Sequence, residues 1–131
     1  MSLSSFFFLD IEELHVSAFL FIINDASYGS ERAYNALRLA GSLTARKQAQ
    51  VRVYLQSDAV SCARAGQLVP TGHYNLELVL NKILRKGEVA LCGDGMDARG
   101  LREVELVAGA RRAAPGELAD WTFEAEKVLI F

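Results

Sequence analysis

Apolar runs that predict strands alternate along this chain with apolar positions at helical spacing. Residues 18–23 are apolar at every position, which is typical of a strand covered on both faces of a sheet. Residues 51–55 alternate between aliphatic residues and bulkier polar ones and predict a second strand. Apolar runs over 89–92 and 128–131 predict two more strands.

Helical patterns lie between these strands. Apolar residues recur at helical spacing over 33–43, and residues 76–84 follow the complete i, i+3, i+4, i+7, i+8 pattern. Asn75 can cap this second helix and Gly87 can end it. Further helices are predicted over 59–66, 101–109 and 118–125. Because strands alternate with helices, the fold class is α/β, with a mainly parallel sheet in a three-layer α/β/α sandwich.

Length and composition narrow the class of protein. The 131 residues suffice for one domain, expected over 18–131, whereas residues 1–17 fit the pattern poorly and are assigned to an amino-terminal extension. A net charge of −2 gives no basic footprint for nucleic acid, and no apolar run approaches the ~20 residues of a membrane span. Two cysteines are too few for a secreted disulfide scaffold, so a reducing, cytoplasmic location is expected.

The stretch 91–100 carries the candidate chemistry. Cys92 ends the third apolar run, Gly93 and Gly95 follow it, and Arg99 precedes a predicted helix. The thiol is therefore expected at the carboxyl end of a buried strand, where ligands bind in open α/β sheets. A helix amino terminus and a guanidinium both favour the reactive thiolate. The two glycines are expected to form a tight turn at the thiol.

Seven more short motifs are informative. They are 24–31 (NDASYGSE), 35–40 (NALRLA), 55–60 (LQSDAV), 66–67 (GQ), 74–76 (YNL), 117–122 (ELADWT) and 127–131 (KVLIF). Together with the loop 92–100, they resemble the DsrE-like family, especially its small YchN-like members. The resemblance extends from about residue 18 to the end of the chain, and it implies a sheet of five strands.

The resemblance also implies sulfur chemistry. Members that act in sulfur relays carry a persulfide on a cysteine at the end of the third strand, seven residues before an Arg-Gly pair. Cys92, Arg99 and Gly100 match that pattern in type and spacing. Many YchN-like members have a second cysteine three residues after the first, where this chain has Gly95. A Cys-x-x-Cys disulfide mechanism is therefore not expected.

Other residues at the same sheet edge are candidates for shaping a pocket. They are Tyr28, Gly29, Asp58, Gly93, Asp97 and Gly100. The Tyr28 hydroxyl can orient a ligand or pack at a helix start. Asp97 opposes a thiolate because nearby carboxylates disfavour it. Arg99 can offset that effect or clamp Asp97 or Asp58 structurally.

The remaining polar features have two interpretations each. Cys62 can face the same edge as a resolving thiol, or be packed and inert. Residues 93–98 match a GxGxx(G/A) pattern, but two aspartates would repel a pyrophosphate. Arg111 and Arg112 are interpreted as a solvated turn. Neither histidine has partners for a metal site, so no metal or cofactor is expected.

Two functions follow from these observations. The leading one is a sulfur-relay protein that accepts sulfane sulfur on Cys92 and passes it on, with donor and acceptor proteins that the sequence does not identify; whether it also turns over as a sulfurtransferase stays open. The alternative is a non-catalytic oligomeric module that binds a small anion or a protein partner at the same edge. The resemblance implies a homotrimer or homohexamer, with subunit contacts expected at Leu68, Val69 and Tyr74.

Overall fold

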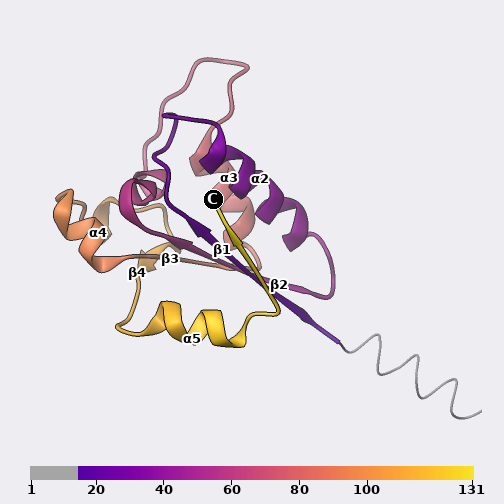
Figure 1. Ribbon diagram of the computed structural model, residues 1–131. Coiled ribbons are helices and arrows are strands. Elements are labelled where there is room, and N and C mark those ends of the chain that lie inside the picture. The colour runs from indigo at the N-terminus through magenta and orange to yellow at the C-terminus, as the bar shows by residue number, and fades with distance from the viewer. Residues whose placement is uncertain (1–14) are drawn as a thin grey trace, which may run out of the picture.

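Five parallel strands form one sheet in the order β4-β3-β2-β1-β5 (Figure 1). The computed structural model describes residues 15–131. The strands are β1 Ser17–Ile23, β2 Ala49–Leu55, β3 Glu88–Leu91, β4 Arg111–Arg112 and β5 Lys127–Ile130. Four of them match the predicted runs to within two residues at each end, which confirms the α/β class and the parallel sheet.

Helices cover both faces of this sheet, as the sandwich prediction requires. They are α2 Arg32–Thr44, α3 Leu76–Leu84, α4 Gly93–Ala98 and α5 Glu117–Glu124, with the 3₁₀ segments η1 Ser57–Ala63 and η2 Glu103–Glu105. Helices α2 and α3 lie together on one face, and α5 covers the other (Figure 1). The Asn75 side chain caps α3 as predicted, because it accepts the Leu78 N–H at 3.3 Å.

The continuous apolar run of β1 supplies two separate cores. Phe21 and Ile23 pack toward α2 and α3, whereas Leu20 and Ile22 pack toward α5. This division follows from the strand, in which successive side chains point to opposite faces. Trp121 of α5 closes the second, smaller core. The smaller core borders the candidate site.

The helix predicted over 101–109 is wrong. The segment holds only the short η2 turn, and its backbone bonds to the last residue of η1 and to Ala65 just beyond it. The Ala65 N–H donates to the Glu105 carbonyl at 2.9 Å. The Val107 N–H donates to the Ala63 carbonyl at 2.8 Å. These tertiary bonds take the place of helical ones, so a weak periodicity could not specify the local structure.

The solvated turn predicted at Arg111 and Arg112 is also wrong, because these residues form β4. Arg111 lies opposite Ala90 of β3, and the Ala113 N–H extends the pairing by donating to the Leu91 carbonyl at 2.8 Å. Two residues are too short for a periodic signal. Arg111 and Arg112 thus supply the one strand that the sequence did not predict, β4, at one edge of the sheet.

The predicted extension over residues 1–17 falls mostly outside the described residues. Within 15–131, Ser17 opens β1, and the His15 imidazole lies 3.3 Å from the Glu126 carboxylate beside β5. None of the helices in this range is long and apolar enough to cross a membrane.

Candidate functional site

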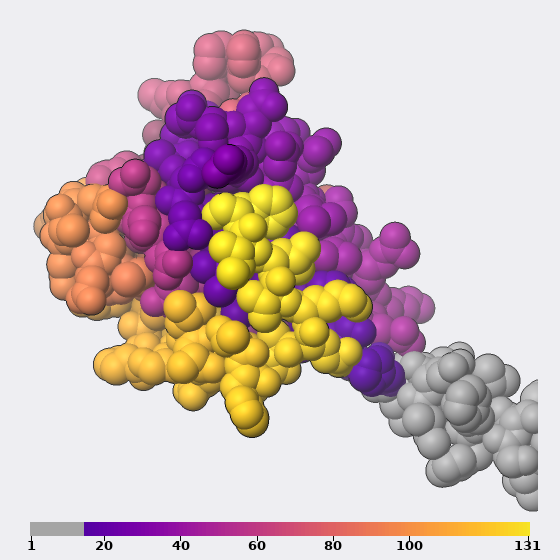
Figure 2. Space-filling view, in the orientation of Figure 1, coloured from indigo at the N-terminus to yellow at the C-terminus, as the bar shows by residue number. Residues whose placement is uncertain are grey.

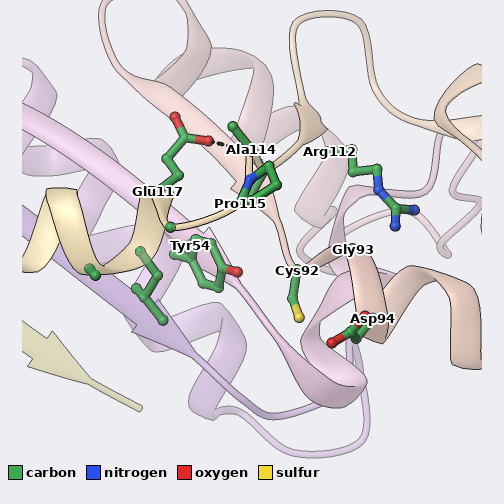
Figure 3. A pocket seen from close by; sticks show the side chains of 12 residues that line it. Tyr54, Cys92, Gly93, Asp94, Arg112, Ala114, Pro115 and Glu117 are labelled. Atoms are coloured by element: carbon green, nitrogen blue, oxygen red, sulfur yellow. Dashed lines mark hydrogen bonds between the residues drawn. The ribbon is translucent and has the colours of Figure 1, made fainter.

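An open cavity of about 340 Å³ lies at the carboxyl ends of β2 and β3, on the face that α5 covers (Figure 3). Small apolar residues of the β4–α5 connection and a few polar side chains form its wall. The polar ones are Tyr54, Cys92, Asp94, Arg112 and Glu117, and the others are Gly93, Ala113, Ala114, Pro115, Gly116, Leu118 and Ala119. This is the edge of a parallel sheet at which ligands commonly bind.

Cys92 is the first residue after β3, and its backbone is held from two sides. Its N–H donates to the Leu55 carbonyl at 2.8 Å, which continues the β2–β3 pairing. Its carbonyl accepts the Met96 N–H at 3.0 Å, which starts α4. The side chain is half-buried and faces the cavity (Figure 3). The apolar run therefore placed the thiol at the correct edge of the sheet.

The predicted tight turn after the cysteine is wrong, because α4 begins directly at Gly93. A Cβ atom at Gly93 would lie 2.6 Å from Nη2 of Arg112, and one at Gly95 would lie 3.2 Å from Cγ1 of Val60. These glycines therefore allow α4 to approach its neighbours closely. Among the three glycines of residues 93–100, Gly100 alone has a left-handed backbone, with φ +62°, directly after α4.

Tyr54 lines the cavity, although no motif in the sequence pointed to it. It is 7% exposed and lies opposite Ala90 in the β2–β3 register. Burial, followed by the charge and side-chain hydrogen bond of Cys92, raises the pKa of Tyr54 to about 12. The alternation of β2 was the available signal, because it places Tyr54 on the opposite face from Val53 and Leu55.

Arg112 also lines the cavity, and its partner is a predicted site residue. Its guanidinium binds both carboxylate oxygens of Asp97, at 2.8 and 2.9 Å. Hydrogen bonding within this pair lowers the pKa of Asp97 and raises that of Arg112. The pair joins β4 to α4 across Gly93. Asp97 thus positions a wall residue and does not itself line the cavity.

Glu117 fixes the opposite wall. Its carboxylate accepts two bonds from Arg111, at 2.6 and 2.5 Å, and one from the Ala114 N–H at 3.0 Å. These bonds, first among them the ones from Arg111, lower the pKa of Glu117. The connection that carries Pro115 is therefore held between β4 and the start of α5.

Arg99 and Asp58, two predicted site residues, contact each other. Nη2 and Nε of Arg99 donate to Oδ1 of Asp58 at 2.7 and 3.2 Å, and Nη1 donates to the Gly95 carbonyl at 3.1 Å. These bonds join α4 to η1. Neither side chain is part of the cavity wall. The geometry therefore matches the interpretation of Arg99 as a structural clamp on Asp58.

Tyr28 and Gly29 precede α2 and are not part of the cavity wall, and the Tyr28 hydroxyl lies at the start of α3. The Tyr28 hydroxyl accepts the Leu76 N–H at 3.0 Å, and its ring stacks on Tyr74 with centroids 5.7 Å apart. Gly29 lies next to it, near Ala26. The structure thus favours the packing interpretation of Tyr28.

Cys62 is separated from Cys92 by its environment. It is fully buried in the core between the sheet and the α2–α3 layer. Burial raises the pKa of the Cys62 thiol to about 12. This thiol does not line the cavity, and the structure favours the inert interpretation.

Known proteins provide independent comparisons. The sequence profile of the DsrE/DsrF-like family matches residues 17–131. Protein YchN of Escherichia coli is 38% identical over 112 residues, which cover 84% of this chain and 95% of that protein. An uncharacterized protein of Methanocaldococcus jannaschii is 38% identical over 114 residues, which cover 86% of this chain and 98% of that protein.

Solved structures agree with these matches. The crystal structure of Escherichia coli YchN superposes with a TM-score of 0.82 at 36% identity, covering 88% of this chain and 100% of that one. A protein of unknown function from Methanobacterium thermoautotrophicum shares the fold, with a TM-score of 0.72 at 13% identity over 88% of this chain and 99% of that one. On the strength of the family match and the YchN identity, the chain belongs to the DsrE/DsrF-like family.

Proposed function

We propose that the protein is a sulfur carrier that holds sulfane sulfur as a persulfide on Cys92. The observation that carries the proposal is a half-buried thiol facing an open cavity at the carboxyl edge of the sheet. Reactive cysteines are partly exposed, whereas structural ones are buried. Membership of the family is consistent with sulfur relay at the family level.

The chemistry would be thiol exchange at sulfur. The Cys92 thiolate attacks the outer sulfur of a donor persulfide, an S–S bond forms at Cys92, and the donor S–S bond breaks. The donor sulfur takes up the proton of the persulfide and leaves as a thiol, so no oxidant or reductant is needed. An acceptor thiolate then attacks the outer sulfur, the S–S bond at Cys92 breaks, and Cys92 leaves as a thiolate.

The cavity wall supports a sulfur substrate more than a small oxyanion. Ala113, Pro115 and Leu118 present apolar surface beside the thiol, and sulfane sulfur is a soft atom that such surface accommodates. The one guanidinium among the described lining residues, that of Arg112, is already bound by Asp97. The carboxylate of Asp97 neutralises much of the positive charge that an anion-binding module would use there.

Intact mass spectrometry after exposure to a small-molecule persulfide tests the proposal. We expect the wild type to gain one sulfur atom, the Cys92→Ser variant to gain none, and the Cys62→Ser variant to behave as wild type. Transfer to an added thiol should restore the original mass. Absence of a sulfur adduct on Cys92 would leave the non-catalytic binding module as the better account.

We further propose that the protein acts as a homotrimer or homohexamer. Leu68, predicted at a subunit contact, is 97% exposed, whereas Tyr74 is stacked on Tyr34 with centroids 4.0 Å apart. Phe123 and Ile130 are also exposed, where the carboxyl-terminal segment lies on the surface beside α5 (Figure 2). Contacts between copies would remove this apolar surface from water. Light scattering should give a multiple of 14.4 kDa, and a monomer mass at micromolar concentration would contradict assembly.

A further inference from the structure

We infer that the Tyr54 hydroxyl is the hydrogen-bond donor that holds the sulfur anion of Cys92, first as thiolate and then as persulfide. The persulfide half of this inference rests on the proposed function, and the thiolate half stands without it. Because this hydrogen bond would be made to the reacting sulfur, the role of Tyr54 would be catalytic.

Strand register brings the two side chains together. Tyr54 of β2 lies opposite Ala90 of β3, and Cys92 lies two residues beyond Ala90. All three residues therefore point to the face that α5 covers, where they belong to the same apolar cluster. Figure 3 shows the Tyr54 hydroxyl directed toward Cys92 within the cavity. Cys92 also helps to raise the pKa of the Tyr54 hydroxyl, as a neighbouring sulfur anion would.

The ring of Tyr54 is held in a fixed orientation. Trp121 meets it edge-on, with centroids 6.5 Å apart and the planes at 84°. The guanidinium groups of Arg52 and Arg111 lie over Trp121, at 5.2 and 5.7 Å from its ring centroid, and hold the indole in turn. The hydroxyl is thus oriented before sulfur arrives, so little ordering remains to be done when the anion forms.

The charged side chains around the cavity are poor candidates for donating a hydrogen bond to the sulfur anion. Arg112, on β4, is engaged by Asp97. Asp94 of α4 and Glu117 of α5 are carboxylates, and both act electrostatically on Tyr54. Carboxylates repel a sulfur anion. Within the described wall of the cavity, Tyr54 is the side chain that offers a proton toward Cys92 (Figure 3).

Tyr54 also keeps its proton over the physiological range. Burial, the neighbouring cysteine and the two carboxylates raise its pKa to about 12, so about one molecule in 10⁵ is ionised at pH 7. The hydroxyl therefore donates throughout the transfer and loses no proton. Its hydrogen bond disperses negative charge on Cys92 sulfur while the donor S–S bond breaks and the new one forms.

The Tyr54→Phe variant tests the inference, because it keeps the ring and removes only the hydroxyl. The matched control is Tyr34→Phe, which lies on α2 away from the cavity. The readout is the pH dependence of Cys92 alkylation, followed by peptide mass spectrometry in the full-length protein. We expect the midpoint to rise by about 1 pH unit in Tyr54→Phe and to stay unchanged in Tyr34→Phe.

Sulfur loading gives a second, smaller readout. At a pH below both alkylation midpoints, a rise of about 1 unit removes about nine-tenths of the thiolate, but the more basic thiolate is about threefold more nucleophilic, so loading should slow about threefold. An unchanged alkylation midpoint in a protein that still loads sulfur overturns the role of Tyr54. A raised midpoint in a protein that takes up no sulfur supports the thiolate bond and overturns the proposed function instead.

A measurement on the wild type guards against misfolding of the variant. With ring-labelled tyrosine, the Tyr54 Cζ resonance should move as the Cys92 thiol ionises, and the Tyr34 resonance should not. Replacement of Cys92 by serine should abolish that movement. A Tyr54 resonance that does not respond to Cys92 ionisation contradicts the inference independently of any Tyr54 variant.

Discussion

The two cysteines lie near the same edge of the sheet but on opposite sides of it. Cys62, in η1, is enclosed by the core under α2 and α3, and burial raises its pKa to about 12. Cys92, after β3, faces an open cavity beside α5. Burial without a compensating charge keeps a thiol protonated. In this protein, the side of the sheet that a thiol faces therefore determines whether it is enclosed in the core or open to a cavity.

Labelling of both thiols in the folded protein is the strongest test of this comparison. With a pKa of about 12, about one Cys62 in 10⁴ is a thiolate at pH 8, and iodoacetamide must also reach a buried atom. We expect Cys92 to react at least about 100-fold faster, as measured by peptide mass spectrometry. The two rates should converge in guanidinium chloride. Similar rates in the folded protein would remove the distinction.

A second thiol at position 95 should sharpen the comparison, because it would share the environment of Cys92. A Cβ at Gly95 lies 3.6 Å from the Cβ of Cys92, within the ~3.5–4.5 Å typical of disulfides. We expect Gly95→Cys to form a disulfide with Cys92 on oxidation. Sulfur loading, measured by intact mass, should then be lost until the protein is reduced.

Gly95→Ala is the control for that variant. It introduces the same crowding against Val60 without a thiol, so any effect that it shares with Gly95→Cys is steric. We expect Gly95→Ala to load sulfur. If Gly95→Cys forms no disulfide after treatment with an oxidant, α4 does not hold position 95 as close to Cys92 as described.

Removal of Trp121 should affect one side of the sheet selectively. Trp121 closes the smaller core against Leu20, Ile22 and Tyr54, so Trp121→Ala should lower the free energy of unfolding by about 3–5 kcal/mol, measured in urea. Under native conditions, the rate of Cys92 alkylation should rise, while Cys62 should stay protected. Equal gains in reactivity at both thiols would show that the two cores do not respond separately. Trp121→Phe should have a smaller effect.

The smallest expected effect concerns the ion pair that fixes the cavity wall. The pKa of Glu117 lies below its ordinary value of 4.5, first because of Arg111. The carboxylate therefore stabilises the fold above about pH 4.5, and this contribution is lost as the pH falls through the lowered pKa. Glu117→Gln should cost about 0.5–1 kcal/mol at pH 7 in urea unfolding. The difference from wild type should vanish near pH 3, and a constant difference would contradict this account.

The strands and the well-patterned helices were predictable because their signals are local. The apolar run of β1 and the complete pattern of α3 need no distant partner to be recognised. β4 and η2 were mispredicted because their backbone bonds go to β3 and to the end of η1. Two residues of strand and one turn of 3₁₀ helix carry too little periodicity to compete with such contacts.

The sequence by itself determined the family, the parallel sheet and the position of Cys92 at its carboxyl edge. Only the tertiary structure decided which side chains surround the thiol. Tyr54 and Arg112 reach the cavity from β2 and β4, while Arg99 pairs with Asp58 of η1 and does not line the cavity. Residue type and spacing along the chain specify elements, whereas the neighbours of a side chain depend on strand order and on the face to which each residue points.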